Sequence, residues 1–368
     1  MNHRERISEI QMAVIMAGGF IELGLYSFPR HLLELAGRPF YPVLLTAVLV
    51  GLALSLSIAH VMLKYPRKTP IEIFKGLFGP YLGTLVGLWA LTFHIILAGV
   101  CLRYFADLVN TYFLPRTPVE TTMMLILLAT LFVNAQGLAA TARVIVLAFL
   151  PVMTMVVVAY LLTVTRMSEF EALVPVLGPI SLPGFARSVS GILYLFIGVE
   201  SIAFLLPLVE KPRRPYFWVA MPVLGNALVL LIALLVTLGV LGFEPAIGLQ
   251  YPGITTLRVL RLPGILMERL GGVVALAWTA LKLVYLSARL ITIPMAMAQI
   301  FNLSVARYRP FLYPAGVMIF FVARWPSNVE ELSWLMQWFV GPVGLLTNGG
   351  LVLLILLVGA LRGRGQSA

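Results

Sequence analysis

Two glutamates stand inside long apolar stretches of this sequence, and they are the residues best placed to do chemistry. Glu22 lies in the stretch GGFIELGLYSFP, and Glu200 lies in the stretch FIGVESIAFLLP. Each follows a glycine, Gly19 or Gly198, and each precedes a proline by seven positions. A charge at the centre of a membrane-crossing helix costs on the order of 3 kcal/mol, so such residues usually handle ions or substrates. The repeated pattern therefore predicts a polar site shared by two apolar segments.

Cations that could balance these glutamates occur later in the chain. Lys282, Tyr285 and Arg289 are spaced by three and four positions, which places them on one stripe of a helix. Two cations and two glutamates balance in charge. We expect Lys282 to pair with Glu22 or Glu200. This pair either fixes the helix register or serves as a proton-linked or substrate-linked switch.

Glycines flank the two glutamates and mark places where a helix could open. Gly18, Gly19, Gly24 and Gly198 each lower helix stability, and a proline follows downstream in both segments. An opened helix offers free N–H groups to a carboxylate and free carbonyls to an ammonium group or a cation. That combination suits a zwitterionic amino acid. The alternative is that these glycines only allow close packing between helices.

Other candidates for chemistry are few. Arg103 and Asp107 stand four apart and are expected to pair locally, while His94 is expected to be a hydrogen-bonded interior residue. Cys101 is the single cysteine, and no second histidine stands at metal-ligand spacing from His94. The sequence contains no G-x-S-x-G, H-E-x-x-H or phosphate-binding loop motif. We therefore expect no enzyme activity, no metal site and no cofactor.

The composition shows which solvent these elements must face. Of 368 residues, 60% are hydrophobic and 11% are charged, and the mean hydropathy is +0.99. Apolar runs of about 20 residues match the hydrocarbon thickness of a bilayer. The net charge of +11 is scattered over short loops, which favours anionic lipid headgroups over nucleic acid as the counter-charge. The predicted class is an all-α integral membrane protein.

The apolar runs predict ten transmembrane helices in a single domain, residues 1–368. The first run, which contains Glu22, is expected to be a retained span and not a cleaved leader. The polar connection 64–80 is expected to form a short amphipathic helix in the membrane interface, and 243–269 a long loop with short surface helices. The excess of Lys and Arg on one set of loops predicts that both termini are cytoplasmic. The expected spans are 8–32, 41–63, 81–113, 119–137, 141–165, 186–208, 214–241, 270–301, 310–325 and 334–361.

Ten spans divide into two repeats of five, at about 8–165 and 186–361, and the two glutamate segments then fall in the first span of each repeat. Many transporters are inverted repeats whose site lies where these first helices break. The matching positions of Glu22 and Glu200 are typical of that arrangement.

Three segments carry a resemblance to a known family. SEIQMAVIMAGGFIELGLYSFP, YPRKTPIEIFKGLFG and FIGVESIAFLLPLV, in this order and with ten spans, resemble the spore germination permeases. These are the B subunits of nutrient germinant receptors, within the amino acid-polyamine-organocation superfamily. The resemblance implies a LeuT-like fold whose first and sixth helices unwind around a central site. It also implies partners, a larger A subunit and a lipoprotein C subunit, in the inner membrane of the spore.

The resemblance also bears on two residues of the predicted site. In LeuT-like proteins the eighth helix packs against the first, near the ion site of sodium-coupled members, so a fixed ammonium at Lys282 would replace an ion. Glu22 departs from the uncharged glycine-rich break that is usual in the family. A ligand carboxylate could lie beside Glu22 only if Glu22 is paired or protonated.

These observations predict a germinant receptor subunit that binds a small nutrient, an amino acid in the first instance, and signals through its partners. The main alternative is an amino acid permease, proton-coupled or exchanging, that works by alternating access. A second alternative is a passive water or ion pathway, or a scaffold for the partner subunits. The predicted substrate-binding residues are Gly18, Gly19, Glu22, Gly24, Gly198, Glu200, Lys282 and Tyr285.

Overall fold

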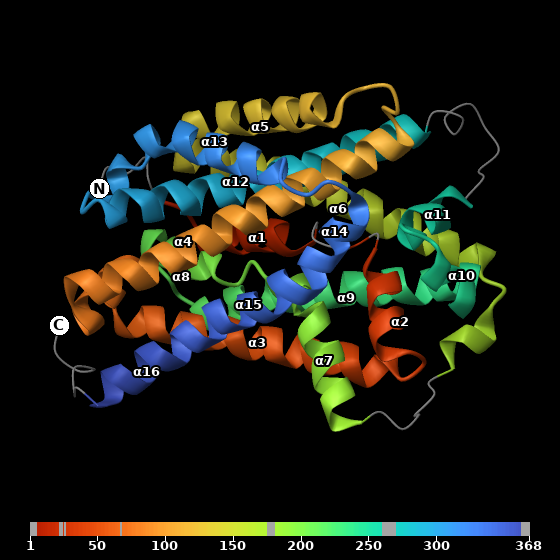
Figure 1. Cartoon of the computed structure of the whole chain (residues 1–368), viewed down its shortest axis with the longest axis horizontal. Helices are drawn as coiled ribbons and strands as arrows, with labels where there is room; N and C mark the ends of the chain where they lie inside the picture. The colour runs from red at the N-terminus through yellow and green to blue at the C-terminus, as the bar shows by residue number, and fades with distance from the viewer. Residues whose placement is uncertain are drawn as a thin grey trace.

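The computed structural model describes residues 6–21, 25, 27–66, 68–174, 181–259 and 270–361. Within these ranges the chain is helical, and its one β-bridge joins Ile7 to Val209. Most of the helices run along the length of an elongated bundle (Figure 1). The predicted all-α class is confirmed.

The first half of the bundle contains six α-helices, and short turns of 3-10 helix follow the last of them. Their bounds are α1 Glu9–Ile21, α2 Phe28–Ala36, α3 Phe40–Lys64, α4 Pro70–Tyr112, α5 Val119–Ala135, α6 Leu138–Thr163, η2 Val164–Arg166 and η3 Phe170–Leu173.

The second half alternates long helices with short ones. Their bounds are α7 Leu182–Ile192, η4 Leu193–Phe196, α8 Ser201–Leu205, η5 Leu206–Leu208, α9 Pro215–Leu241, α10 Phe243–Gly248, α11 Pro252–Arg258, α12 Leu270–Ile300, η6 Val305–Arg307, η7 Arg309–Phe311, α13 Leu312–Ala323, α14 Val329–Trp334, η8 Leu335–Val340, α15 Gly341–Leu345, η9 Leu346–Gly350 and α16 Leu351–Leu361. Of the predicted loop 243–269, the described part forms the short helices α10 and α11.

Seven helical stretches of the described chain are long and apolar enough to cross a membrane. Three shorter apolar helices, Glu9–Phe20, Val119–Ala135 and Arg309–Ala323, occupy three further predicted positions. The total of ten spans and the division into domains stay predictions.

The first and sixth predicted spans are both broken. Helix α1 ends at Ile21 and α2 begins only at Phe28, so the predicted span 8–32 is two helices. In the sixth span, η4 ends at Phe196 and α8 begins at Ser201. Proline stands in the first turn of both α2 and η5, where its missing N–H costs nothing. The predicted breaks are confirmed.

Helix α4 begins at Pro70, so the second part of the predicted amphipathic connection 64–80 forms its first turns. Thr69 and Glu72 form a capping box at its start, and Gly79 bends it with a φ of 83°. The apolar face of these turns, which includes Ile71 and Phe74, is buried within the protein. The prediction of a helix is confirmed, but its apolar face packs on protein because the bend at Gly79 folds it back against the bundle.

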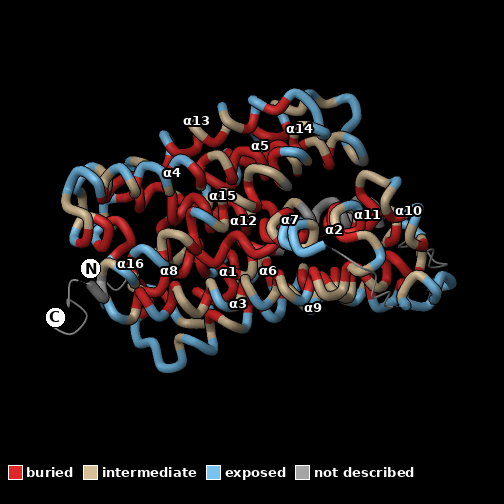
Figure 2. The backbone as a smooth tube through the Cα atoms, turned by 60° about the horizontal axis from the view of Figure 1, so that its bottom comes forward, coloured by how far each residue is buried: buried red, intermediate tan, exposed pale blue. Residues whose placement is uncertain are grey.

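The core is built around α12. Helix α12 contacts α1, α4, α5 and α6, while α1 also contacts α9. Figure 2 shows buried backbone running through the middle of the bundle and exposed segments around it. Large apolar side chains on the outer faces, such as Phe132 and Leu147, are more than two-thirds exposed. Such outward apolar surface fits a protein whose solvent is lipid.

Close packing between α1 and α12 generates a first prediction. A methyl group added at Gly18 would overlap the Val284 side chain, whereas nothing lies within 4 Å of one added at Gly225. Gly18→Ala should therefore destabilise the fold by about 1–3 kcal/mol, the usual cost of overpacking. Gly225→Ala, the matched control in α9, should be neutral or stabilising by up to about 1 kcal/mol. Thermal unfolding of both variants checks this, and equal melting temperatures would contradict the packing.

Candidate functional site

Glu200 lies at the end of the break in the sixth span and is the centre of a buried polar cluster. It forms an ion pair with Arg289, and its Oε2 accepts a hydrogen bond from the Gly198 N–H at 2.8 Å. Asn348 Nδ2 donates to the same oxygen at 3.4 Å, and His94 Nε2 lies 3.4 Å from Oε1. Glu200 is 8% exposed and Arg289 is 2% exposed. The carboxylate thus accepts hydrogen bonds from the break, from α12 and from the last span, and it faces the His94 ring of α4.

The break itself requires glycine. Gly198 has a φ of +155°, and a Cβ there would lie 2.7 Å from the Phe20 ring and 3.1 Å from the carbonyl carbon of Gly19. A Cβ on Gly19 would lie 3.6 Å from Gly198 Cα. The two predicted glycines therefore bring the end of α1 into backbone contact with the break. Gly18 serves close packing against Val284, and Glu22 and Gly24 lie outside the described residues.

The predicted stripe on α12 forms a stack of two cations with one ring between them. Lys282 Nζ lies 4.8 Å from the centre of the Tyr285 ring, and Arg289 Cζ lies 5.2 Å from it. Lys282 Nζ also donates to the carbonyl of Cys101 at 2.7 Å and lies 5.3 Å from the Phe105 ring. All three stripe residues are buried. Cation–π attraction of this kind is strongest where water is excluded.

The partner of Glu200 differs from our sequence expectation. Arg289, and not Lys282, is the cation paired with Glu200. The reason is the distance along the α12 axis. The two cations are seven positions apart, and a helix rises about 10 Å over that length. The Glu200 side chain lies beside the later of these two turns of α12, the one that carries Arg289. The other expected partner of Lys282, Glu22, lies outside the described residues.

Three members of the cluster, Arg289, His94 and Asn348, were not among the predicted substrate-binding residues. His94 was expected to be an interior residue, and its Nδ1 does contact the Ala90 carbonyl, but its other ring nitrogen faces Glu200. Asn348 was missed. It lies in η9, a π-helical turn, and such turns occur frequently at functional sites. In the sequence, the only sign of its role was an amide side chain within the apolar last span. The predicted Arg103–Asp107 pair is present at 3.0 Å.

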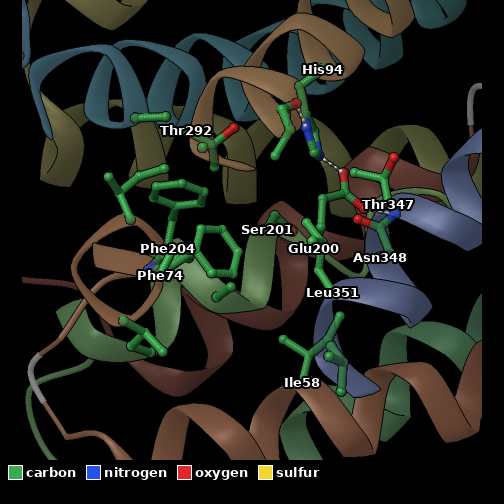
Figure 3. A pocket seen from close by; sticks show the side chains of 18 of the residues that line it. Ile58, Phe74, His94, Glu200, Ser201, Phe204, Thr292, Thr347, Asn348 and Leu351 are labelled. Atoms are coloured by element: carbon green, nitrogen blue, oxygen red, sulfur yellow. Dashed lines mark hydrogen bonds and ion pairs between the residues drawn. The ribbon is translucent and has the colours of Figure 1, made fainter. Parts of the chain in front are cut away.

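A cavity of about 80 Å³ adjoins Glu200 on the side where α3 ends and α4 begins (Figure 3). Its walls come from α3, α4, α8, α12, η9 and α16, and none of the described residues of α1 lines it. In Figure 3, His94 and Asn348 converge on Glu200 at one end of the cavity. The labelled apolar side chains around the rest are Ile58, Phe74, Phe204 and Leu351.

The first and sixth spans contact each other at three positions along the bundle. Beside the cavity end of the bundle, Ile7 N–H donates to the Leu208 carbonyl at 3.2 Å. At mid-depth, Gly19 contacts Gly198. Beyond the breaks, the His31 ring hydrogen-bonds to the Tyr194 hydroxyl at 2.8 Å. The described parts of the two broken spans are therefore held together at three points.

The ion pair generates a second prediction. Glu200→Gln leaves the Arg289 guanidinium buried without a counter-charge, which typically costs about 3–5 kcal/mol. The double variant Glu200→Gln with Arg289→Gln should recover part of that loss, because no net charge is then buried. Glu330→Gln, at an exposed position, is the control and should change stability by less than about 0.5 kcal/mol.

Thermal unfolding of the four proteins, with the folded yield after purification, measures this. A Glu200→Gln variant as stable as the original chain would show that the pair does not hold the break. The same conclusion would follow if the double variant were no more stable than Glu200→Gln alone.

Comparison with known proteins places this geometry in a family. A family model described as "Spore germination protein" matches residues 6–329. Spore germination protein YndE of Bacillus subtilis (strain 168) is 24% identical over 368 residues, which cover 98% of each chain. Spore germination protein B2 of the same organism is 21% identical over 327 residues, covering 89% of this chain and 88% of that protein.

Solved structures extend the comparison to the fold. MhsT in complex with L-phenylalanine superposes with a TM-score of 0.65 at 16% identity, over 99% of this chain and 97% of that one. A Na⁺-coupled sialic acid symporter superposes with a TM-score of 0.69 at 14% identity, over 96% and 79%. These similarities confirm the predicted LeuT-like fold. By the family match across most of its length, the chain belongs to the spore germination permease family.

Proposed function

We propose that this chain is the membrane subunit of a spore germinant receptor, and that it binds a small nutrient, in the first instance an amino acid. Binding favours one arrangement of the bundle, and the A subunit and the C lipoprotein subunit read that change. The subunit performs no covalent chemistry. The observation that carries the proposal is the meeting of two broken helices at Gly19 and Gly198, beside a buried pair of opposite charges.

The charge pair has the two signs that a zwitterion needs. Glu200 and the carbonyls freed at the break suit an ammonium group. Arg289 suits a carboxylate, because its Nε–H is buried and has no hydrogen-bond partner among the described residues. A second donor of Arg289, Nη2, reaches the Ile197 carbonyl at 3.4 Å. A ligand carboxylate would satisfy a donor that the protein leaves unfilled.

Signalling in this proposal follows from the ties between the first and sixth spans. A ligand at mid-depth has to separate Gly19 from Gly198, which are in backbone contact. Separation there strains the Ile7–Leu208 and His31–Tyr194 hydrogen bonds on either side. A ligand shifts such an equilibrium only by its differential affinity for the two arrangements. Partner subunits that contact either end of these spans would sense the shift.

A permease that works by alternating access is the second candidate, favoured by the likeness to transporter structures over nearly the whole chain. It needs the same site, and only net movement of the substrate separates it from a sensor. We therefore test binding and flux on the same preparation.

The test uses the purified chain in nanodiscs and in proteoliposomes, with a panel of amino acids. A binding amino acid at 100 times its Kd should stabilise the fold by about 2.7 kcal/mol. The Glu200→Gln, Arg289→Gln double variant should lose this stabilisation, while Arg324→Gln, at an exposed position, should keep it. Binding without uptake supports the sensor, and saturable uptake supports the permease. No stabilisation by any amino acid would contradict the proposed ligand class.

We also propose that the chain resides in the inner membrane of the spore with both termini in the cytoplasm. Lys211 and Glu169 are exposed residues on loops predicted to face opposite sides, and Cys101 is buried. A membrane-impermeant maleimide applied to intact cells should label Glu169→Cys directly, and Lys211→Cys only after permeabilisation. The native chain, which contains only Cys101, is the control. The reverse labelling pattern would invert the topology.

A further inference from the structure

The cavity beside Glu200 is separate from the meeting point of the two breaks. It lies between α8 on one side and α4 and α16 on the other, and none of the described residues of α1 reaches it. Side chains such as Ile58, Phe74, Phe204, Leu351 and Ile355 make most of its wall apolar. An apolar lining of this kind disfavours ions and favours uncharged guests.

One end of the cavity is polar but carries no net charge. Glu200 is neutralised by Arg289, and its carboxylate also accepts hydrogen bonds from Gly198 and Asn348 and faces the His94 ring, so one of its four acceptor positions is left. A further ion in the cavity would find no unbalanced charge to hold it. The end of the cavity, like its walls, therefore favours an uncharged ligand.

Thr347 supplies a specific hydrogen-bonding position at this end. Its Oγ1 accepts a hydrogen bond from Trp89 Nε1 at 3.1 Å. Among the described residues no acceptor takes the Thr347 hydroxyl proton. A hydroxyl has one donor and two acceptor positions, so Thr347 retains one donor for a guest. The carboxylate of Glu200, at the same end, can accept a hydrogen bond from that guest.

We propose that this cavity is a second ligand site, which takes a small uncharged molecule with an aliphatic body and one hydroxyl group. The hydroxyl oxygen accepts from Thr347, and the hydroxyl proton is donated to Glu200. At about 10–15 Å³ for each enclosed water-sized group, 80 Å³ holds on the order of six such groups. An alcohol of about that many non-hydrogen atoms matches this volume.

This site goes beyond the proposed nutrient site, because its guest touches α8 and not α1. Helix α8 is the second half of the broken sixth span, and the guest fills the space between it and α4. An occupant therefore holds α8 in the arrangement described here. The two sites share Glu200, but the contacts of the guest with Thr347 and with the apolar walls do not require the nutrient site at the breaks.

The test is photolabelling of the full chain in nanodiscs with an aliphatic diazirine alcohol, followed by peptide mass spectrometry. We expect labels on Phe204, Leu351 and Ile355, and competition by excess 1-hexanol. Ala296→Phe fills the cavity from α12 and should reduce these labels by about tenfold, which corresponds to 1.4 kcal/mol of binding. Leu353→Phe, at a lipid-facing position on α16, is the matched control and should leave them unchanged.

Two further measurements test the proposal even if Ala296→Phe does not fold. Thr347→Val, which is nearly isosteric, should weaken labelling by the alcohol but not by the diazirine alkane of equal length. An alkylammonium diazirine of equal length should label the cavity less than the alcohol does.

Several outcomes would overturn the second site. One is labelling that is not competed by hexanol, or that concentrates on outer residues such as Leu353, which indicates partition into the bilayer. Others are equal labelling of the cavity by the ammonium probe, and Thr347→Val without effect on the alcohol.

Discussion

The ion pair between Glu200 and Arg289 is the interaction on which the rest of this structure depends. Either charge alone would be prohibitively costly at this depth in a membrane protein, and together they form a neutral unit. The pair forms because the sixth span breaks at Gly198, where the freed N–H donates to the same carboxylate. Break and pair therefore stabilise each other, and an intact helix would lose both the N–H donor and the position of Glu200.

The surroundings of the pair connect it to four elements of the bundle. Through Arg289 it is fixed to α12, through His94 to α4, and through Asn348 to the last span. Gly198 places the end of α1 directly against the break. A small polar ligand at this point competes with contacts from four elements, which is why the site suits a receptor whose output is a rearrangement of helices.

Much of this arrangement follows from the sequence, because apolar length, glycine and proline act locally. Apolar length fixed the helix positions, and the glycine–glutamate–proline pattern located both breaks. The identity of the cation was not accessible in this way. Lys282 and Arg289 share one helical stripe, and only the depth at which Glu200 leaves the break selects Arg289.

Two other features depend on tertiary geometry. The π-helical turn that turns Asn348 toward Glu200 has no signature in residue spacing. The bend at Gly79, which buries Ile71 and Phe74, was visible in the sequence only as a glycine before a proline.

A cryo-electron microscopy map of the chain in nanodiscs, which resolves side chains around the two breaks, tests the central claim most directly. We expect non-helical density from 197 to 200, with the Glu200 carboxylate joined to the Arg289 guanidinium. A continuous helix from 182 to 208, with Glu200 directed away from α12, would contradict it.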